Sequence, residues 1–251
     1  MAHMPPQAAA PAQPHTSPAA HRYQPCAGDL EISGQNMRGA SRIDVCTEHC
    51  ARAMAHSHIH GMIETNHDTI TDIIIKHKVQ RAGLYRWFRN PTQTGGHVGK
   101  GTALLVANSI LSLPEGVTQT PQNNEIIMQD DGGKLMAVHI YMRGTPTVVV
   151  VTHLPHSDTD RAAFLTDAAT KLRSAIIDKQ QKEGYKQWPS VIRISDDNMV
   201  RDPRKDFLPP EPAGPSKAHA AMDAFMRAIS PNGMKDAYRH TDPEGDATTY
   251  R

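Results

Sequence analysis

Short apolar runs rich in β-branched residues recur along the chain, and polar turns separate them. Such runs predict β-strands, and the unbroken valine run at 148–151 is typical of a strand buried on both faces. The predicted strands are 29–38, 59–63, 102–107, 125–129, 134–142, 147–152 and 191–194, with a hairpin turn at 131–133 and the start of another strand at 247–251.

Between some of these strands, apolar residues recur at helical spacing instead. They predict one helix over 41–57, a second over about 160–182 and a third that begins at Ser216. Ser157 and Asp158 are candidate N-caps of the second helix, and Gly184 stands where its C-terminal glycine is expected. Strands that alternate with helices predict the α/β class.

The chain has 251 residues and a formal net charge of +1, which allows one large domain or two small ones. This near-neutral charge excludes a histone-like protein that binds nucleic acid over its whole surface. Residues 1–27 are rich in Pro, Ala, Gln and His and lack large apolar side chains. We therefore expect a disordered tail, followed by a folded domain over 28–251.

Three cysteines are too few for a disulfide framework, which predicts a reducing compartment. No apolar run in the sequence approaches the roughly 18 residues that a transmembrane helix needs. The first residues do not have the charge and apolar pattern of a secretory signal. The sequence therefore predicts a soluble, intracellular protein without a membrane partner.

Polar side chains that suit a metal or a phosphate follow four of the predicted strands. Asn36, Glu64 and the pair Asp196 and Asn198 each come at the end of a strand, and His153 ends another. Carboxylate and amide oxygens suit Mg²⁺, which polarises a phosphoryl oxygen in phosphodiester hydrolases, and a His can move a proton there. A plain turn is the alternative for the Asp and Asn residues, which are common turn formers.

The order of these motifs along the chain resembles a known family. They are Gln35-Asn36-Met37-Arg38-Gly39, Ile63-Glu64-Thr65, Thr152-His153-Leu154-Pro155, Ser195-Asp196-Asp197-Asn198, Asp236-Ala237-Tyr238-Arg239 and the glycine-rich segment with its strand at 99–107. The succession resembles the endonuclease/exonuclease/phosphatase superfamily, most closely the endonuclease domains of non-LTR retrotransposons. The resemblance implies a four-layer, deoxyribonuclease-like α/β/β/α sandwich, a Mg²⁺ or Mn²⁺ requirement, cleavage of phosphodiester bonds in DNA and, for a retrotransposon-derived protein, a nuclear location.

The resemblance also implies roles for individual residues. Glu64 matches the metal-binding Glu of the family, and Asn36 matches the Asn that positions metal and phosphate. Asp196 and Asn198 match the Asp and Asn of a Gly-Asp-Phe-Asn motif, in which the Asp orients or activates the nucleophile. His153 lies where relatives have a Tyr or a His near the scissile phosphate. Asp197 replaces the Phe of that motif, and we expect it to add a third carboxylate to the metal site.

The sequence departs from the family at its C-terminal end. Relatives continue beyond the strand that 247–251 begins, to a Ser-Arg-Ile-Asp segment and a terminal Ser-Asp-His that supplies their main acid/base group. No residue after Arg251 is present to match them. From this we expect a sandwich that lacks its last strands, a sheet edge that favours association, and little or no nuclease turnover.

Basic residues interleave with aromatic ones in the segment before the glycine-rich loop. This composition suits a nucleic-acid backbone and exposed bases, although aromatic residues of a strand that pack inward are an equal alternative. The candidate nucleic-acid-binding residues are Arg38, Lys76, Lys78, Arg86 and Arg89.

Other functions remain open at the level of the sequence. Cys46, His49 and Cys50 share one predicted helix, and with His56, His58 and His60, which follow closely, they form a candidate zinc site. The alternative is that the two thiols are small core residues and the histidines are surface polar positions. The same scaffold also suits a phosphatase of a small phosphorylated molecule, or a non-catalytic remnant that binds nucleic acid or protein.

Overall fold

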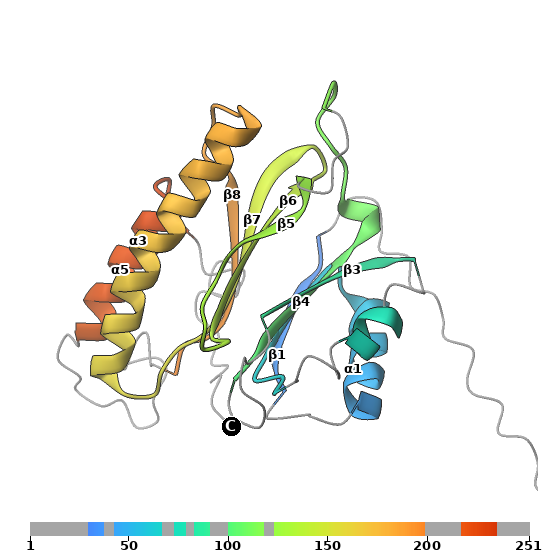
Figure 1. Ribbon diagram of the computed structural model, residues 1–251, viewed down its shortest axis with the longest axis horizontal. Helices are drawn as coiled ribbons and strands as arrows, with labels where there is room; N and C mark the ends of the chain where they lie inside the picture. Colours follow the sequence, from blue (N-terminus) through green and yellow to red (C-terminus); the bar gives the residue numbers. More distant parts are fainter. Residues whose placement is uncertain are drawn as a thin grey trace, which may run out of the picture.

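Two β-sheets pack face to face, and helices cover both outer faces (Figure 1). The computed structural model describes residues 30–37, 43–66, 73–78, 83–90, 100–117, 123–198 and 217–234. The expected tail, Arg38, the motif at 236–239 and the expected strand at 247–251 lie outside these residues. The layers follow the order α/β/β/α, as the resemblance implied.

Each sheet has four strands in the described residues. The first has the order β1 (Ile32–Asn36), β2 (Ile59–Ile63), β4 (Thr102–Ala107), β3 (Tyr85–Asn90), and the second has the order β5 (Glu125–Gln129), β6 (Leu135–Met142), β7 (Thr145–His153), β8 (Ser190–Asp196). Helix α1 (Ile43–His56) covers the first sheet, while α3 (Asp158–Glu183) and α5 (Lys217–Ile229) cover the second (Figure 1). Residues 73–78 are also helical, and Asn108–Ile110 form a 3-10 turn.

The parallel pairs in the two sheets decide where the functional residues lie. β1 pairs with β2 in parallel, with Asn36 opposite Ile63, and β7 pairs with β8 in parallel, with His153 opposite Asp196. A crossover helix connects each pair, α1 in the first sheet and α3 in the second, because parallel strands cannot be joined by a tight turn. The C-terminal ends of all four strands therefore carry the polar residues singled out from the sequence.

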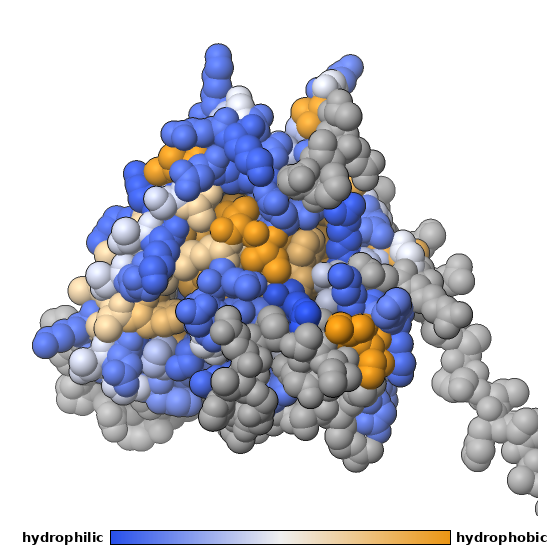
Figure 2. Space-filling view, viewed as in Figure 1, coloured by the Kyte–Doolittle hydropathy of each residue, from blue (hydrophilic) through white to orange (hydrophobic). Residues whose placement is uncertain are grey.

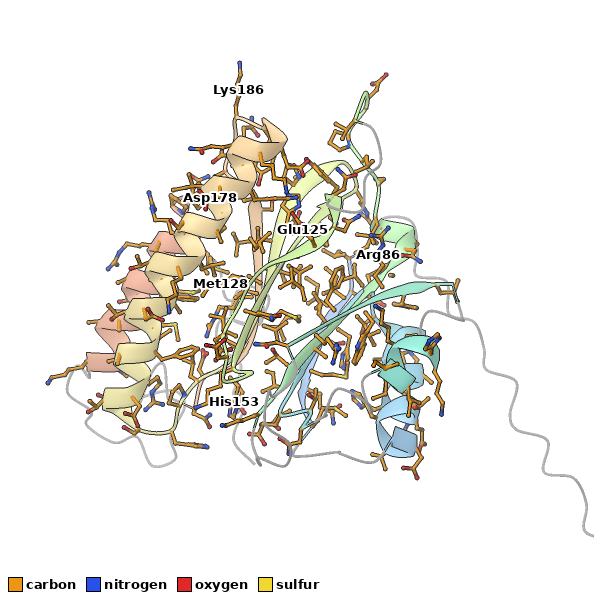
Figure 3. All side chains as sticks on the ribbon, in the orientation of Figure 1. Arg86, Glu125, Met128, His153, Asp178 and Lys186 are labelled. Carbon is orange, nitrogen blue, oxygen red and sulfur yellow. The ribbon has the colours of Figure 1, made fainter. Side chains whose placement is uncertain are left out.

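The core follows the alternation of side chains along buried strands. Val149 and Val151 face the other sheet, while Val148 and Val150 face α3 and α5, so β7 is buried on both sides as its valine run predicts. Figure 3 shows side chains filling the space between the sheets and beneath the helices. At the edge formed by β5, residues 125–128 are only partly buried, and Figure 2 shows apolar side chains in the middle of this face.

Two glycines allow the sheets to approach closely near the functional residues. A Cβ at Gly61 would lie 2.8 Å from Cγ2 of Ile194, and one at Gly34 would meet the same methyl group. Gly34 and Gly61 lie on β1 and β2, and Ile194 lies on β8 across the sandwich. Any larger side chain would force the strands apart, so these glycines set the distance between the two halves of the site.

The ends of α3 confirm the predicted capping residues. The Ser157 side chain accepts a hydrogen bond from the Asp160 amide, and Gly184 has a left-handed backbone with its amide donating to the Gln180 carbonyl. The helix begins two residues earlier than its apolar spacing predicts. Among the described helices, none is long and apolar enough to span a membrane.

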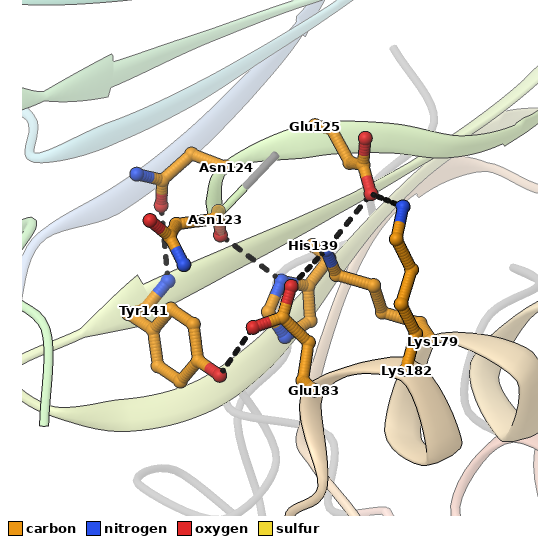
Figure 4. Close-up of polar contacts among 8 residues, drawn as sticks. All are labelled: Asn123, Asn124, Glu125, His139, Tyr141, Lys179, Lys182 and Glu183. Atoms are coloured by element: carbon orange, nitrogen blue, oxygen red, sulfur yellow. Dashed lines mark hydrogen bonds and ion pairs between the residues drawn. The ribbon is translucent and has the colours of Figure 1, made fainter. Parts of the chain in front are cut away.

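A buried polar network fills the space under the C-terminal end of α3 (Figure 4). Lys179 is 3% exposed, and its Nζ lies 2.8 Å from Glu125 Oε1 and 2.7 Å from Glu183 Oε1. The Tyr141 hydroxyl donates to Glu183 Oε2 at 3.1 Å. Burial raises the pKa of Glu183, but the hydrogen bond and charge of Lys179 outweigh it, so this pKa is lowered overall.

Two buried histidines should make the fold sensitive to acid. Burial and the charge of Lys179 lower the pKa of His139 to about 4, and burial with the neighbouring His49 lowers that of His60 to about 4. The unfolded chain binds these protons near pH 6.5, so stability is complete above that pH and is lost as the pH falls toward 4. Each histidine should cost about 2 kcal/mol between pH 7 and pH 5.

Urea unfolding at the two pH values tests this prediction. His139→Phe removes one titrating group and should reduce the loss of stability between pH 7 and pH 5 by about 2 kcal/mol. An equal loss in wild type and His139→Phe would contradict the assignment.

Candidate metal centre

Three side chains from both sheets meet at one end of the sandwich. Ligand atoms of Glu64, His153 and Asp196 all lie within 4.8 Å of one another. Nε2 of His153 is 3.2 Å from Oε1 of Glu64. The Asn36 amide donates to both carboxylates, at 3.0 Å to Glu64 Oε1 and 2.8 Å to Asp196 Oδ2.

The donor set at this point fits a hard divalent cation. The carboxylates of Glu64 and Asp196 converge there with the imidazole of His153. Two negative charges so close together are stabilised by a cation that both carboxylates can bind. His153 is 4% exposed and lies on the inner face of β7, at the end of the molecule away from Lys186 (Figure 3). The set therefore lies at the rim that these strand ends form.

The backbone is strained at Glu64, whose φ of 55° lies in the left-handed region that costs most non-glycine residues about 1 kcal/mol or more. Asn198, two residues after Asp196, has φ 45°, which Asn adopts more readily than most residues. The chain after Glu64 is fixed by hydrogen bonds from the Thr65 amide to Gly101 O and from the Asn66 amide to Lys100 O. Local strain that tertiary contacts hold in place is common at functional sites.

Solved structures share the fold of this chain, although no model of a protein family matches the chain and no curated protein matches it. The chain is similar to the AP endonuclease LMAP from Leishmania major, with a TM-score of 0.53 and 12% identity over 85% of this chain and 70% of that one. For an AP endonuclease from Archaeoglobus fulgidus, the TM-score is 0.51 and the identity is 16% over 87% of this chain and 76% of that one. For the human Nocturnin catalytic domain with bound sulfate anion, the TM-score is 0.50 and the identity is 15% over 87% of this chain and 76% of that one.

The chain has the four-layer α/β/β/α fold of these structures. At these identities the likeness concerns the fold, which confirms the α/β/β/α sandwich that the sequence motifs implied. The roles of individual residues rest on the geometry of this chain.

Within this fold, Asp197 does not join the other carboxylates. Side chains alternate along β8, so Asp196 faces the opposite sheet, whereas Asp197 follows on the side that faces α5. There Asp197 forms an ion pair with Arg193, with Nη1 at 3.2 Å from Oδ2. The expectation of a third carboxylate at the metal is therefore not supported, because the two aspartates are consecutive residues and so face opposite sides of the sheet.

Asn198 holds the loop after β8 rather than pointing to an open site. Its side-chain Nδ2 donates to the Leu154 carbonyl at 2.7 Å, and its backbone amide donates to Asp196 Oδ1 at 3.3 Å. Asn198 therefore links the chain segments that follow His153 and Asp196. The structure brings Asn36, Glu64, His153 and Asp196 together and places Asn198 directly behind Asp196.

The sequence motifs did not predict a role for Arg161, which also links the chain segments that follow His153 and Asp196. Its guanidinium is 6% exposed and donates to the His156 carbonyl at 3.0 Å, and it also bonds the carbonyls of Asp197 and Asn198. A signal was present, because Arg161 occupies a core-facing position of α3, one turn before the buried Leu165. A charged residue in an apolar stripe indicates a buried partner.

Replacing Arg161 should loosen the centre without touching its ligands. Arg161→Ala takes the shared donor away from three partly buried backbone carbonyls, which costs about 2 kcal/mol, and should weaken Mg²⁺ binding about tenfold. Urea unfolding and calorimetric titration with Mg²⁺ measure the two effects. Asp178→Ala, exposed on the same helix, should change neither, and Mg²⁺ affinity unaltered in Arg161→Ala would contradict the proposed link.

The candidate nucleic-acid-binding residues do not gather at the rim. Lys76 and Lys78 are exposed on the helical segment 73–78, and Arg86 and Arg89 are partly buried on β3. Arg86 pairs with Val106, at the opposite end of the sheet from the metal centre, whereas Arg89 pairs with Ala103, near the end of the sheet that carries Glu64. The structure thus brings together the predicted metal residues but not the predicted basic ones, and Arg38 lies outside the described residues.

Proposed function

We propose that this chain is a metal-dependent phosphodiester hydrolase that acts on DNA. The observation that carries the proposal is the convergence of Glu64 and Asp196 from separate sheets, with Asn36 hydrogen-bonded to both. In our proposal Glu64 and Asp196 hold Mg²⁺ or Mn²⁺. When bound, such a cation polarises a phosphoryl oxygen and offsets the negative charge that develops in the transition state.

The chain's own residues would order the reacting groups. Asn36 fixes the two carboxylates and has an amide that can also donate to a phosphate oxygen. We assign Asp196 to orienting the attacking water, because its Oδ1 is itself held by the Asn198 amide. His153, which contacts Glu64, is placed to move a proton at the attacking or leaving oxygen. Water adds to phosphorus, one P–O ester bond breaks, and the leaving oxygen takes up a proton.

DNA as the substrate is the finer part of the proposal. Two of the similar structures are AP endonucleases, and the exposed Lys76 and Lys78 add positive charge to the surface. The proposed resemblance to the endonuclease domains of non-LTR retrotransposons is supported by the order of the sequence motifs alone. The proposed nuclear location depends on that resemblance.

Cleavage of supercoiled plasmid tests the proposal. The convergence of Glu64, His153 and Asp196 replaces the expectation of little or no turnover, so purified protein should nick the plasmid with Mg²⁺ or Mn²⁺ and stop when a chelator is added. An abasic-site duplex and a small phosphomonoester, assayed in parallel, distinguish an endonuclease from a phosphatase. Folded protein that binds Mg²⁺ but cleaves none of the three substrates would refute the proposed activity.

A further inference from the structure

The candidate zinc cluster on α1 does not gather enough ligands in the part of the chain that the structure describes. Nε2 of His49 lies 2.8 Å from Nε2 of His60, but no third ligand atom groups with these two. Cys46 and Cys50 are buried in the apolar cluster beneath α1. The structure therefore favours the alternative that the two thiols are core residues.

A buried ion pair on β8 has a closer connection with function. The Arg193 guanidinium donates to Asp197 through both terminal nitrogens, with Nη1 3.2 Å from Oδ2. Its Nη2 also donates to Oγ1 of Thr152 on β7, at 3.2 Å. One guanidinium therefore binds side chains of the two strands that carry His153 and Asp196.

The two residues that Arg193 binds are sequence neighbours of the metal centre. Thr152 precedes His153 on β7. Asp197 follows Asp196 at the end of β8, and the parallel register places His153 beside Asp196. Consecutive side chains of a strand face opposite sides of the sheet, so a side chain held on the outer face fixes the direction of its neighbour on the inner face. Arg193 is thus connected to both centre residues through their neighbours.

The surroundings of the guanidinium leave it little freedom to move. The Arg193 side chain is 7% exposed, and its Cζ lies 5.8 Å from the centre of the Phe225 ring on α5. Phe225 is itself buried in the apolar cluster between this sheet and its helices. A guanidinium has its donors in a rigid planar fork, so it can hold a carboxylate and a hydroxyl in one fixed arrangement.

The same pair accounts for the carboxylate that does not join the metal centre. Asp197 stands where the Gly-Asp-Phe-Asn motif has an apolar residue, and it lies on the side of the sheet that faces α5. A charge in such a place needs a partner, and Arg193 supplies one from the same face of β8, four residues earlier. Asp197 therefore adds a charged link behind the centre, and not a ligand to it.

We propose that Arg193 is a positioning residue of the metal centre, which acts through Asp197 and Thr152. With the guanidinium in place, the carboxylate of Asp196 and the imidazole of His153 keep the orientation that the centre requires. This inference rests on the proposed function, in which those two groups bind the cation, orient water and move a proton. Because Arg193 lies on the other face of the sheet, its loss should slow the reaction without weakening the binding of DNA.

Two substitutions of Thr152 test the proposal with little change in shape. Thr152→Val replaces the hydroxyl by a methyl group, whereas Thr152→Ser keeps the oxygen that accepts from Arg193. Thr152→Val should lower kcat for plasmid cleavage about tenfold, leave KM unchanged and weaken Mg²⁺ binding in calorimetry. Thr152→Ser should retain most of the activity and affinity. Thr147→Val, which changes a buried threonine at the other end of β7, is the matched control and should affect neither.

Arg193→Met tests whether Thr152 and Asp197 act through one guanidinium. The Asp197 side chain is 29% exposed, so its carboxylate can turn to water in this variant. Arg193→Met should lower kcat at least tenfold, and adding Thr152→Val or Asp197→Asn should then have little further effect. Urea unfolding identifies any variant that is merely unstable, in which case Thr152→Val alone decides the question.

Mg²⁺ affinity separates the failure of this proposal from the failure of the proposed function. If wild type binds Mg²⁺ but cleaves no substrate, the hydrolase assignment is wrong, and the Mg²⁺ affinity of Thr152→Val still tests the role of Arg193. Equal Mg²⁺ affinity in wild type and Thr152→Val would overturn the positioning role, and so would fully additive losses in the double variants. Wild type that binds no Mg²⁺ would overturn both.

Discussion

Glu64→Gln is expected to lower kcat/KM for metal-dependent plasmid cleavage by about 10³-fold. The substitution keeps the size of the side chain and an oxygen that can accept from Asn36, but it removes one of the two charges that converge at the centre. Mg²⁺ affinity, measured by calorimetry, should fall in the same variant. Glu48→Gln, an exposed residue of α1, should leave both quantities unchanged.

The neighbouring aspartates provide a sharper comparison. Asp196→Asn should reduce activity about as much as Glu64→Gln, whereas Asp197→Asn should reduce it far less, because Asp197 pairs with Arg193 on the other face. Urea unfolding identifies any variant that is merely unstable. If Glu64→Gln is folded and as active as wild type, Glu64 does not hold the catalytic metal and the proposed centre is wrong.

The strands and helices were largely predictable because local pattern and burial agree. Strands β2, β4 and β5 begin and end at the predicted residues, since each is a short apolar or alternating run between polar turns. β7 is longer than predicted, because Thr145 and Pro146 extend its pairing with β6 beyond the valine run. Strand order could not be read from any one segment, because pairing depends on partners distant in the sequence.

The site was predictable only where one residue carries its own signal. A carboxylate, an amide or an imidazole at the end of a strand is visible in the sequence, and Asn36, Glu64, His153 and Asp196 do converge. The contacts that position them were not predicted, because Arg161 acts through backbone carbonyls that no motif records. Because side chains alternate along β8, the sequence does indicate that Asp196 and Asp197 face opposite sides of the sheet. Which of the two faces the metal centre follows only when the side that Ile194 faces is known.

Gly61→Ala is expected to separate the two halves of the centre. The new Cβ would lie 2.8 Å from Cγ2 and 3.1 Å from Cδ1 of Ile194, so β2 must move away from β8. Overpacking of this kind costs about 1–3 kcal/mol of stability. Because Glu64 lies three residues after Gly61 and Asp196 two after Ile194, a displacement of about 1 Å should also reduce activity about 10²-fold.

A second substitution tests whether this contact is the cause. Ile194→Ala removes both methyl groups that the new side chain would meet, so the double variant Gly61→Ala/Ile194→Ala should recover most of the Mg²⁺ affinity and activity. Ile192→Ala, two residues earlier on the same face of β8, should not rescue Gly61→Ala. Equal rescue by both would mean that general loosening of the core, and not the approach of Gly61 to Ile194, sets the spacing of Glu64 and Asp196.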